Sequence, residues 1–313
     1  MARSRENRLY DPRQGDAPLL IREVAFGGDV EEPARTNYFT AYWMKAGAGK
    51  FWADAAMHAF EAPSLLFFVP YQHVRFEPVA NVVGEMIQFH ANYLCVETFH
   101  AEIGCSGVLF NDPYGAPIVR LDDRTTVEVS GLIDRMRQEQ ADRGLAHNEA
   151  LLAYLKVLLI LATRLKTSAV GGCDDSARRH PAIADLRELI EQHYCRLHAP
   201  SAYAELLHMS PKTLGRIVRE QLGKTLTDLI QERILTHAKW QLLHTMRPVK
   251  EIAREVGFRD ELYFSRLFKK STGYSPTFFR EYETEIRGGS NLSMLSVPAP
   301  IQRSAEATDN SDV

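Results

Sequence analysis

The 313-residue sequence has few cysteines and no long uncharged apolar run. Its four cysteines, Cys95, Cys105, Cys173 and Cys195, are 10, 68 and 22 residues apart, and no CxxC pair occurs. This spacing indicates neither a zinc site nor a disulfide framework, so a reducing compartment is expected. The N-terminus lacks the apolar stretch of a secretory signal, and the most apolar segment, residues 151–166, contains a lysine. We therefore expect a cytoplasmic protein that does not span a membrane.

The sequence also lacks a strong net charge. Its total of -3 by itself argues against a nucleic-acid partner, since phosphate binding requires a basic face. The charge is unevenly distributed, however. Residues 178–287 contain 19 Lys+Arg and 14 Asp+Glu, a net charge of +5, and the remaining residues carry -8. This asymmetry hints at a partner for one of the segments, although a surplus of five equally fits a solvated surface.

The hydrophobic pattern divides the chain into strand-rich and helical regions. Between residues 18 and 119, short apolar runs are separated by turns that contain Gly or Pro, which predicts the strands of a small barrel or sandwich. The run at residues 50–57 is one of these predicted strands. Later segments show helical periodicity. We predict a multi-domain α+β fold with an arm (1–17), a barrel (18–121), two helices (122–167), a linker (168–179), an all-α domain (180–287) and a disordered tail (288–313).

Residues 201–224 contain the signals of a short helix, a tight turn and a second helix. Ser201 can cap the first helix, Ser210 and Pro211 can open the second, and Gly223 can close it. In a helix-turn-helix unit, the second helix enters the major groove of DNA. Taken alone, the same pattern equally fits two packed helices of any bundle.

The pattern repeats in residues 251–273, where Gly257 supplies the turn, Asp260 the cap and Gly273 the end of the second helix. Residues 226–245 between the units predict a helix of roughly 30 Å at about 1.5 Å per residue. One turn of B-DNA is about 34 Å, so a rod of this length could place two such helices in successive major grooves. The duplication is much more specific than either unit alone.

The second unit and its continuation, GFRDELYFSRLFKKSTGYSPTFFR, strongly resemble the signature of the AraC/XylS transcription regulators. The resemblance covers about residues 181–287, and the first unit matches more loosely. The matching residues are Ala253, Gly257, Phe258, Phe264, Arg266, Phe268, Lys269, Gly273, Ser275, Pro276, Phe279 and Arg280.

The resemblance implies that exposed early positions of both second helices read bases. These are Lys212, Thr213, Arg216, Glu261, Leu262, Tyr263 and Arg266. Gly215 departs from this pattern, because it has no side chain with which to read a base. Arg216 and Arg266 are the strongest candidates, since arginine can bind guanine through two hydrogen bonds; a phosphate contact or a solvated charge is the alternative for each. The residues suited to phosphate contacts are Arg219, Lys269, Lys270 and Arg280.

The resemblance also implies an N-terminal cupin-like barrel that binds a small effector, followed by dimerisation helices. The candidate effector-binding residues are Tyr42, Trp52, His58, Phe67, His73 and Phe89. Each could instead simply fill the barrel. The candidate dimerisation residues, which could instead only cover the barrel, are Leu151, Leu155, Leu158, Leu159 and Ala162.

Pro70 and His73 match a cupin corner weakly, but the HxH pair of metal cupins is missing, so we expect no metal, no cofactor and no enzymatic activity. The implied partners are double-stranded promoter DNA, a small-molecule effector, RNA polymerase and a second copy of the chain. The leading hypothesis is an effector-responsive transcriptional activator. The alternatives are a metal-dependent cupin enzyme with a helical appendage and a constitutive DNA-binding regulator without a ligand.

Overall fold

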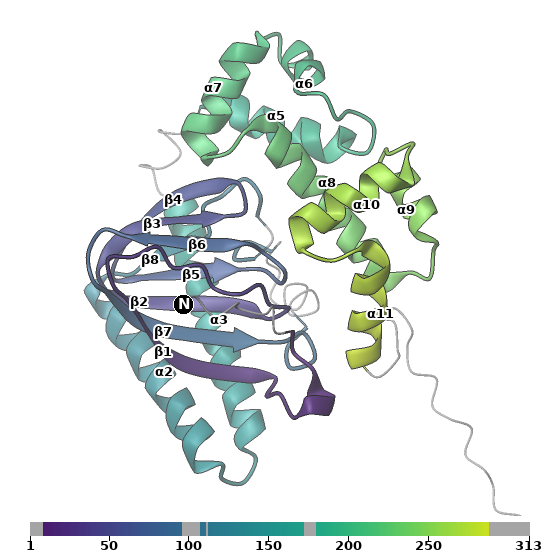
Figure 1. Ribbon diagram of the computed structural model, residues 1–313. Coiled ribbons are helices and arrows are strands. Elements are labelled where there is room, and N and C mark those ends of the chain that lie inside the picture. The colour runs from purple at the N-terminus through teal and green to yellow at the C-terminus, as the bar shows by residue number, and fades with distance from the viewer. Residues whose placement is uncertain (1–8, 96–106, 111, 172–179, 288–313) are drawn as a thin grey trace, which may run out of the picture.

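The computed structural model describes residues 9–95, 107–110, 112–171 and 180–287. Two antiparallel sheets and two long helices form the N-terminal part, and a group of shorter helices packs beside one end of the sheets (Figure 1). This arrangement confirms the predicted multi-domain α+β fold. Residues 1–8 of the arm, 172–179 of the linker and the tail 288–313 lie outside the described residues.

The strands follow the predicted apolar runs closely. They are β1 (Leu19–Phe26), β2 (Phe39–Ala46), β3 (Ala48–Ala53), β4 (Ala56–Glu61), β5 (Ser64–Phe68), β6 (Val74–Pro78), β7 (Val82–Phe89) and β8 (Ile118–Arg120). One sheet has the order β1-β7-β2-β5-β8 and the other β4-β3-β6. One prediction was wrong: the run at 50–57 is two strands, because Asp54 adopts a left-handed turn conformation (φ 53°) that reverses the chain after Ala53.

The five-stranded sheet is buried on both faces. Successive side chains of a strand point to opposite faces. On β2, Ala41 and Trp43 contribute to a core with the long helices, whereas Tyr42 and Met44 contribute to a core with the three-stranded sheet. The N-terminal domain therefore has three layers: helices, a five-stranded sheet and a three-stranded sheet.

The helical layer consists of α2 (Asp123–Asp142) and α3 (His147–Gly171). A capping box between Asp122 and Thr125 starts α2. The proposed dimerisation stripe on α3 requires a correction, because its residues are at most 4% exposed and pack into the core beneath the helix. The alternative interpretation of this stripe, a cover for the sheet, fits the structure. Val157, on the other side of α3, is 46% exposed.

The C-terminal domain comprises α5 (Pro181–His193), α6 (Pro200–Leu206), α7 (Pro211–Leu222), α8 (Leu226–His244), α9 (Val249–Glu255), α10 (Glu261–Thr272) and α11 (Pro276–Ile286). The helix α8 lies between the group α5–α7 and the group α9–α11 (Figure 1). Its capping box, formed by Thr225 and Asp228, fixes its start. Both faces of α8 carry buried residues, so it serves as the central rod that the sequence predicted.

Candidate functional site

The two helix-turn-helix units share the same turn geometry. After α6, His208 adopts a left-handed conformation (φ 52°), and the Met209 N–H donates to the Ala204 carbonyl at 2.9 Å. After α9, Gly257 takes the left-handed position (φ 91°), and the Phe258 N–H donates to the Ala253 carbonyl at 2.8 Å. These six-to-one hydrogen bonds end both first helices in the same way and direct the chain into the second helix.

The second helices, α7 and α10, are also bounded alike. Each begins at a side-chain cap, Ser210 or Asp260, and each ends at a left-handed glycine, Gly223 or Gly273. Both are 12 residues long, and the following helices begin at capping residues two positions after each glycine. The duplication predicted from sequence therefore extends to the backbone geometry.

The outer face of α7 presents the predicted cations to solvent. Lys212 and Arg219 are exposed, and the Arg216 side chain is 63% exposed and paired with Glu220 at 3.0 Å. The Thr213 hydroxyl lies 2.8 Å from the Ser210 hydroxyl, within the N-cap. A Cβ added at Gly215 would meet nothing within 4 Å, so this position faces open space.

The outer face of α10 combines apolar and basic groups. Leu262 is 71% exposed and Tyr263 49% exposed. Arg266, Lys269 and Lys270 are exposed on the same helix, and Glu261 is half-buried. Two of the residues that match the signature, Phe264 and Phe268, are fully buried.

Arg280, predicted to contact phosphate, has a different role. Its guanidinium donates to the carbonyl of Leu242 (3.2 Å) in the last turn of α8 and to that of Arg247 (2.6 Å) in the connection to α9, and burial lowers its pKa. Carbonyls of a last helical turn lack partners within the helix, so Arg280 joins the C-terminal end of α8 to the segment that follows it. The signature arginine thus has a structural role, and its contact with phosphate stays a prediction.

A second feature joins the two domains through Glu283 of α11. The side chain is 2% exposed overall and accepts hydrogen bonds from Tyr71 and from Asn37 (3.2 Å), both in the N-terminal domain. His90 Nε2 lies 3.6 Å from the carboxylate, and Arg287 pairs with it at 3.0 Å. Burial alone would raise the pKa of Glu283. The hydrogen bonds and positive charges around the carboxylate outweigh this effect, and its pKa is lowered from 4.5 to about 2. The carboxylate is therefore held ionised inside the interface.

Other contacts extend this interface. The Tyr282 hydroxyl donates to the Tyr10 carbonyl at 3.0 Å, and the ring of Tyr10 packs on His90 at 4.4 Å. At the other end, the Met57 N–H donates to the Gly223 carbonyl at 3.3 Å, and Lys224 donates to the Pro113 carbonyl at 2.8 Å. The N-terminal domain thus contacts both the α7 end and α11.

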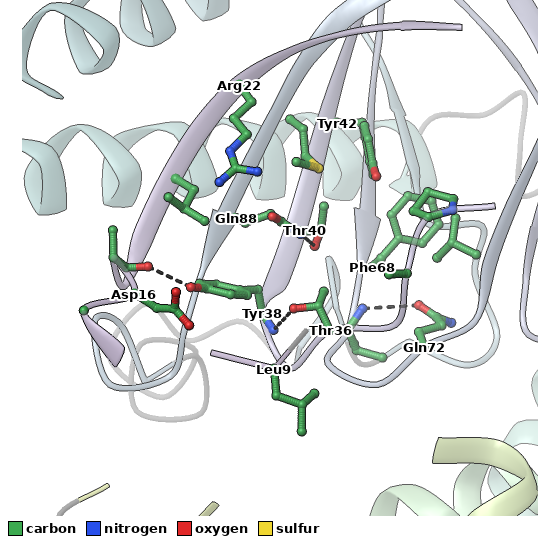
Figure 2. A pocket seen from close by; sticks show the side chains of 18 residues that line it. Leu9, Asp16, Arg22, Thr36, Tyr38, Thr40, Tyr42, Phe68, Gln72 and Gln88 are labelled. Atoms are coloured by element: carbon green, nitrogen blue, oxygen red, sulfur yellow. Dashed lines mark hydrogen bonds between the residues drawn. The ribbon is translucent and has the colours of Figure 1, made fainter. Parts of the chain in front are cut away.

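A pocket of about 540 Å³ opens on the side of the five-stranded sheet that faces the three-stranded sheet. Figure 2 shows the side chains that line it, among them Arg22, Thr40, Tyr42 and Gln88 on the strands. The lining residues are Leu9, Gly15, Asp16, Ala17, Leu20, Arg22, Pro33, Ala34, Thr36, Tyr38, Thr40, Tyr42, Phe68, Val69, Gln72, Val74, Met86 and Gln88. The volume of the pocket and its mostly apolar lining with a few polar side chains are both typical of small-molecule sites.

Of the predicted effector-binding residues, Tyr42 lines this pocket. Phe67 and Phe89 do not, because they belong to the opposite face of the sheet and pack beneath the long helices. A side-chain period of two places Phe68 on the pocket face and its neighbour Phe67 on the helix face.

The remaining three predicted residues lie on the smaller sheet and its turns. Trp52 stacks against the Arg75 guanidinium (3.9 Å to the ring centroid), and His73 pairs with Glu32. His58 packs against Phe51 at 5.3 Å between ring centroids, and burial lowers its pKa to about 4, with the charges of Lys224 and Lys166 adding to the effect. None of the three is among the pocket's lining residues.

Two further features bear on the class of protein. Within the described ranges, no group of three or more His, Cys, Asp or Glu could hold a metal ion. The helices in those same ranges include none that is both long and apolar enough to cross a bilayer.

Residues 203–282 match the model of a family described as "Helix-turn-helix domain". The match begins within α6 and includes both turns and both exposed second helices, so this part of the chain is a helix-turn-helix domain. This match and the relatives below agree with the resemblance of this part of the chain to the AraC/XylS regulators.

Similar curated proteins are bacterial regulators. The arabinose operon regulatory protein of Salmonella typhimurium is 37% identical over 31% of this chain and 35% of its own length. The transcriptional activator RhaS of Escherichia fergusonii is 30% identical over 56% of this chain and 59% of its own length. The transcriptional activator RhaR of Enterobacter sp. is 29% identical over 55% of this chain and 60% of its own length. The matches thus span less than two thirds of each of these relatives.

Two solved structures were also found to be similar. The C-terminal domain of AraT from Geobacillus stearothermophilus is 34% identical and covers 34% of this chain and 88% of its own, with a TM-score of 0.33. ToxT from Vibrio cholerae is 13% identical and covers 84% of this chain and 97% of its own, with a TM-score of 0.36.

Proposed function

We propose that this protein is a sequence-specific DNA-binding transcription regulator that responds to a small-molecule effector. The observation that carries the proposal is the matched pair of helix-turn-helix units on α8, each presenting an exposed arginine on its second helix. Arg216 and Arg266 read guanines through bidentate hydrogen bonds, while Lys212, Arg219, Lys269 and Lys270 contribute base or phosphate contacts. Leu262 and Tyr263 contact the apolar edges of bases.

The regulator acts as a homodimer and as an activator that works with RNA polymerase. Relatives that match the chain are named transcriptional activators, which supports the sign of regulation. The stripe first assigned to dimerisation is buried within the protomer, so the dimer uses the outer side of α3, where Val157 is exposed and Ile160 and Leu161 are half-buried.

The effector acts through the pocket of the N-terminal domain. Pocket residues Thr36 and Tyr38 flank Asn37, which donates to Glu283 of α11. The pocket residue Leu9 precedes Tyr10, whose N–H donates to the Asn37 side chain at 2.7 Å. A ligand that displaces either segment alters the environment of Glu283, and so changes how α9–α11 sits against the N-terminal domain. The two recognition helices then change their relative placement on DNA.

Fluorescence anisotropy with the full chain tests the DNA-binding part. Sequences enriched from a random duplex library should bind with a steep salt dependence and at least ~1,000-fold more tightly than bulk DNA, on the order of the ratio typical of specific regulators. Arg216→Ala and Arg266→Ala should each relax the preference at particular base pairs, whereas Arg120→Ala, on an exposed strand of the N-terminal domain, should not. The absence of any sequence preference would overturn the proposal.

A further inference from the structure

The pocket floor consists of side chains from adjacent strands. The strand register aligns Arg22 with Met86 and Met86 with Tyr42, and the next row aligns Leu20, Gln88 and Thr40. These side chains point to the same face, because aligned residues of neighbouring strands share a face of the sheet. Figure 2 shows Arg22 and Tyr42 reaching toward the pocket interior from either side of this floor.

Three of the polar side chains that line the pocket have partners. The Gln88 amide donates to the Thr40 hydroxyl at 3.3 Å, and the Tyr38 hydroxyl donates to the Ala17 carbonyl at 2.8 Å. These side chains form hydrogen bonds with each other or with the backbone in the absence of a ligand. They shape the pocket, and a bound molecule is not required to complete their hydrogen bonds.

Arg22 and Tyr42 differ from them. Within the described part of the chain, neither the Arg22 guanidinium nor the Tyr42 hydroxyl has a hydrogen-bond or ion-pair partner, although Tyr42 is only 4% exposed. For the buried Tyr42, a donor without a partner costs free energy, whereas Arg22 is an exposed residue whose guanidinium carries five donors and no acceptor. Both groups therefore offer donors to an occupant of the pocket.

The charge of the lining is arranged asymmetrically. Among the described lining residues, Arg22 is the sole Lys or Arg and Asp16 the sole acid. Asp16 accepts a hydrogen bond from the Asp11 N–H at 3.1 Å within the N-terminal turn, and it lies beyond Tyr38 in Figure 2. The opposite end has the apolar residues Phe68, Val69 and Val74, and the side-chain carbonyl of Gln72 there accepts from the Val69 N–H at 3.2 Å. One cation beside an apolar wall suits a single anionic group on an apolar body.

We propose that the pocket binds an organic carboxylate with an apolar body. Arg22 binds the carboxylate through parallel N–H donors, the geometry in which guanidinium and carboxylate match best. The body lies over Met86 toward Phe68 and Val74, and Tyr42 donates to a further oxygen of the ligand. The inference rests on the proposed function in that it names the chemical class of the effector.

Isothermal titration calorimetry with the full chain tests this assignment with three related probes. They are 3-phenylpropionate, 3-(4-hydroxyphenyl)propionate and the neutral 3-phenyl-1-propanol. Both carboxylates should bind at least tenfold more tightly than the alcohol. Arg22→Gln should weaken both carboxylates by about 10- to 100-fold, in line with a lost charge-assisted hydrogen bond, and Arg22→Lys should restore part of the loss. Arg75→Gln, whose guanidinium stacks on Trp52 away from the pocket, is the matched control.

Tyr42→Phe should lower the affinity of the hydroxylated probe to that of 3-phenylpropionate. Binding of neither carboxylate at millimolar concentration, equal binding of the alcohol, or carboxylate binding unchanged in Arg22→Gln would each overturn the inference. DNA binding by the same preparations separates the two proposals. If DNA binding is retained while carboxylates fail, the ligand assignment alone falls; if DNA binding is also absent, the proposed function falls.

Discussion

The Tyr71 hydroxyl of the N-terminal domain donates a hydrogen bond to the Glu283 carboxylate of α11, and both side chains are 2% exposed. The two residues are 212 positions apart in sequence. The ring of Tyr71 also packs against Phe279 at 4.9 Å between centroids, so the tyrosine is part of the core of the helical domain. The domains are thus joined by a buried, charge-assisted contact beside the pocket.

Removal of this hydroxyl should loosen the interface. Tyr71→Phe keeps the ring but deprives a buried carboxylate of one donor, which is expected to lower the free energy of unfolding by about 1.5–3 kcal/mol. Urea unfolding provides the measurement, with Tyr154→Phe as the control. Glu283→Ala should also raise the radius of gyration in small-angle scattering by freeing α11. Wild-type values for both variants would show that this contact does not hold the domains together.

His58 should make the stability of the N-terminal domain depend on pH. Burial, aided by Lys224 and Lys166, lowers its folded-state pKa to about 4 from the ordinary 6.5. The unfolded chain therefore binds more protons between these values, and the free energy of unfolding decreases as pH falls from about 6.5 to 4. The slope contributed by one such group is at most about 1.4 kcal/mol per pH unit.

Urea titrations at several pH values should show this decrease in the wild type and a flatter profile for His58→Asn. His147→Asn, at the start of α3, serves as the control. Glu283 titrates in a separate, lower range, because its stabilising contribution is complete above its ordinary pKa of 4.5 and is lost as pH falls toward about 2. An unchanged slope in His58→Asn would refute the assignment to this residue.

Two glycines should respond in opposite directions to alanine. Gly257 has a φ of 91°, and a Cβ there would lie 2.3 Å from the Cys195 carbonyl oxygen. Gly257→Ala should therefore destabilise the second unit by more than about 1 kcal/mol. Gly215→Ala enters open space inside α7 and should stabilise the helix by roughly 0.5–1 kcal/mol. Thermal unfolding distinguishes them, and a destabilised Gly215→Ala would contradict the described geometry.

The two sides of α3 should behave differently. Leu158→Asp places a charge in a fully buried position, so the N-terminal domain should fail to fold, as seen by circular dichroism. Val157→Asp changes a residue that is 46% exposed and should leave the fold intact while converting a dimer to a monomer in analytical ultracentrifugation. A folded Val157→Asp variant that remains dimeric would place the dimer contact elsewhere.

Helix boundaries could be predicted well because their signals are local. Ser210 and Asp260 cap the second helices and Gly223 and Gly273 end them, as their positions in the sequence indicate. In the first unit, however, His208 occupies the left-handed position that glycine occupies in the second. A histidine at this position gives no turn signal, which is why the first unit matches the pattern more loosely.

The pocket could not be predicted from the same kind of information. Both faces of the five-stranded sheet are buried, so adjacent residues such as Phe67 and Phe68 are both aromatic and both in a core. The sequence of a strand shows which residues share a face only where apolar and polar residues alternate, and this requires one polar face. Arg22 gave no signal, because it is exposed at the mouth of the pocket and an exposed arginine in an alternating strand equally fits an ordinary surface position. The buried side of the helix α3 was equally hard to predict, since most sides of this helix carry apolar residues of its own.

The interface depends on contacts that no local pattern encodes. Glu283 lies in a helix with other acids, and only its distant partners Tyr71, Asn37 and His90 distinguish it from Glu281 and Glu285. Arg280 shows the reverse: the signature marked it correctly as important, but its role is to bond the end of α8. Sequence patterns therefore identified the class of domain more reliably than the role of individual side chains.

Hydroxyl-radical footprinting of the full chain on an enriched DNA site tests the central claim most directly. Two matched units on one rod should protect two patches on the same face of the duplex, about 10 base pairs apart. Arg216→Ala should weaken one patch and Arg266→Ala the other. A single protected patch, or an equal loss of both patches in both variants, would contradict the account of two recognition helices in successive major grooves.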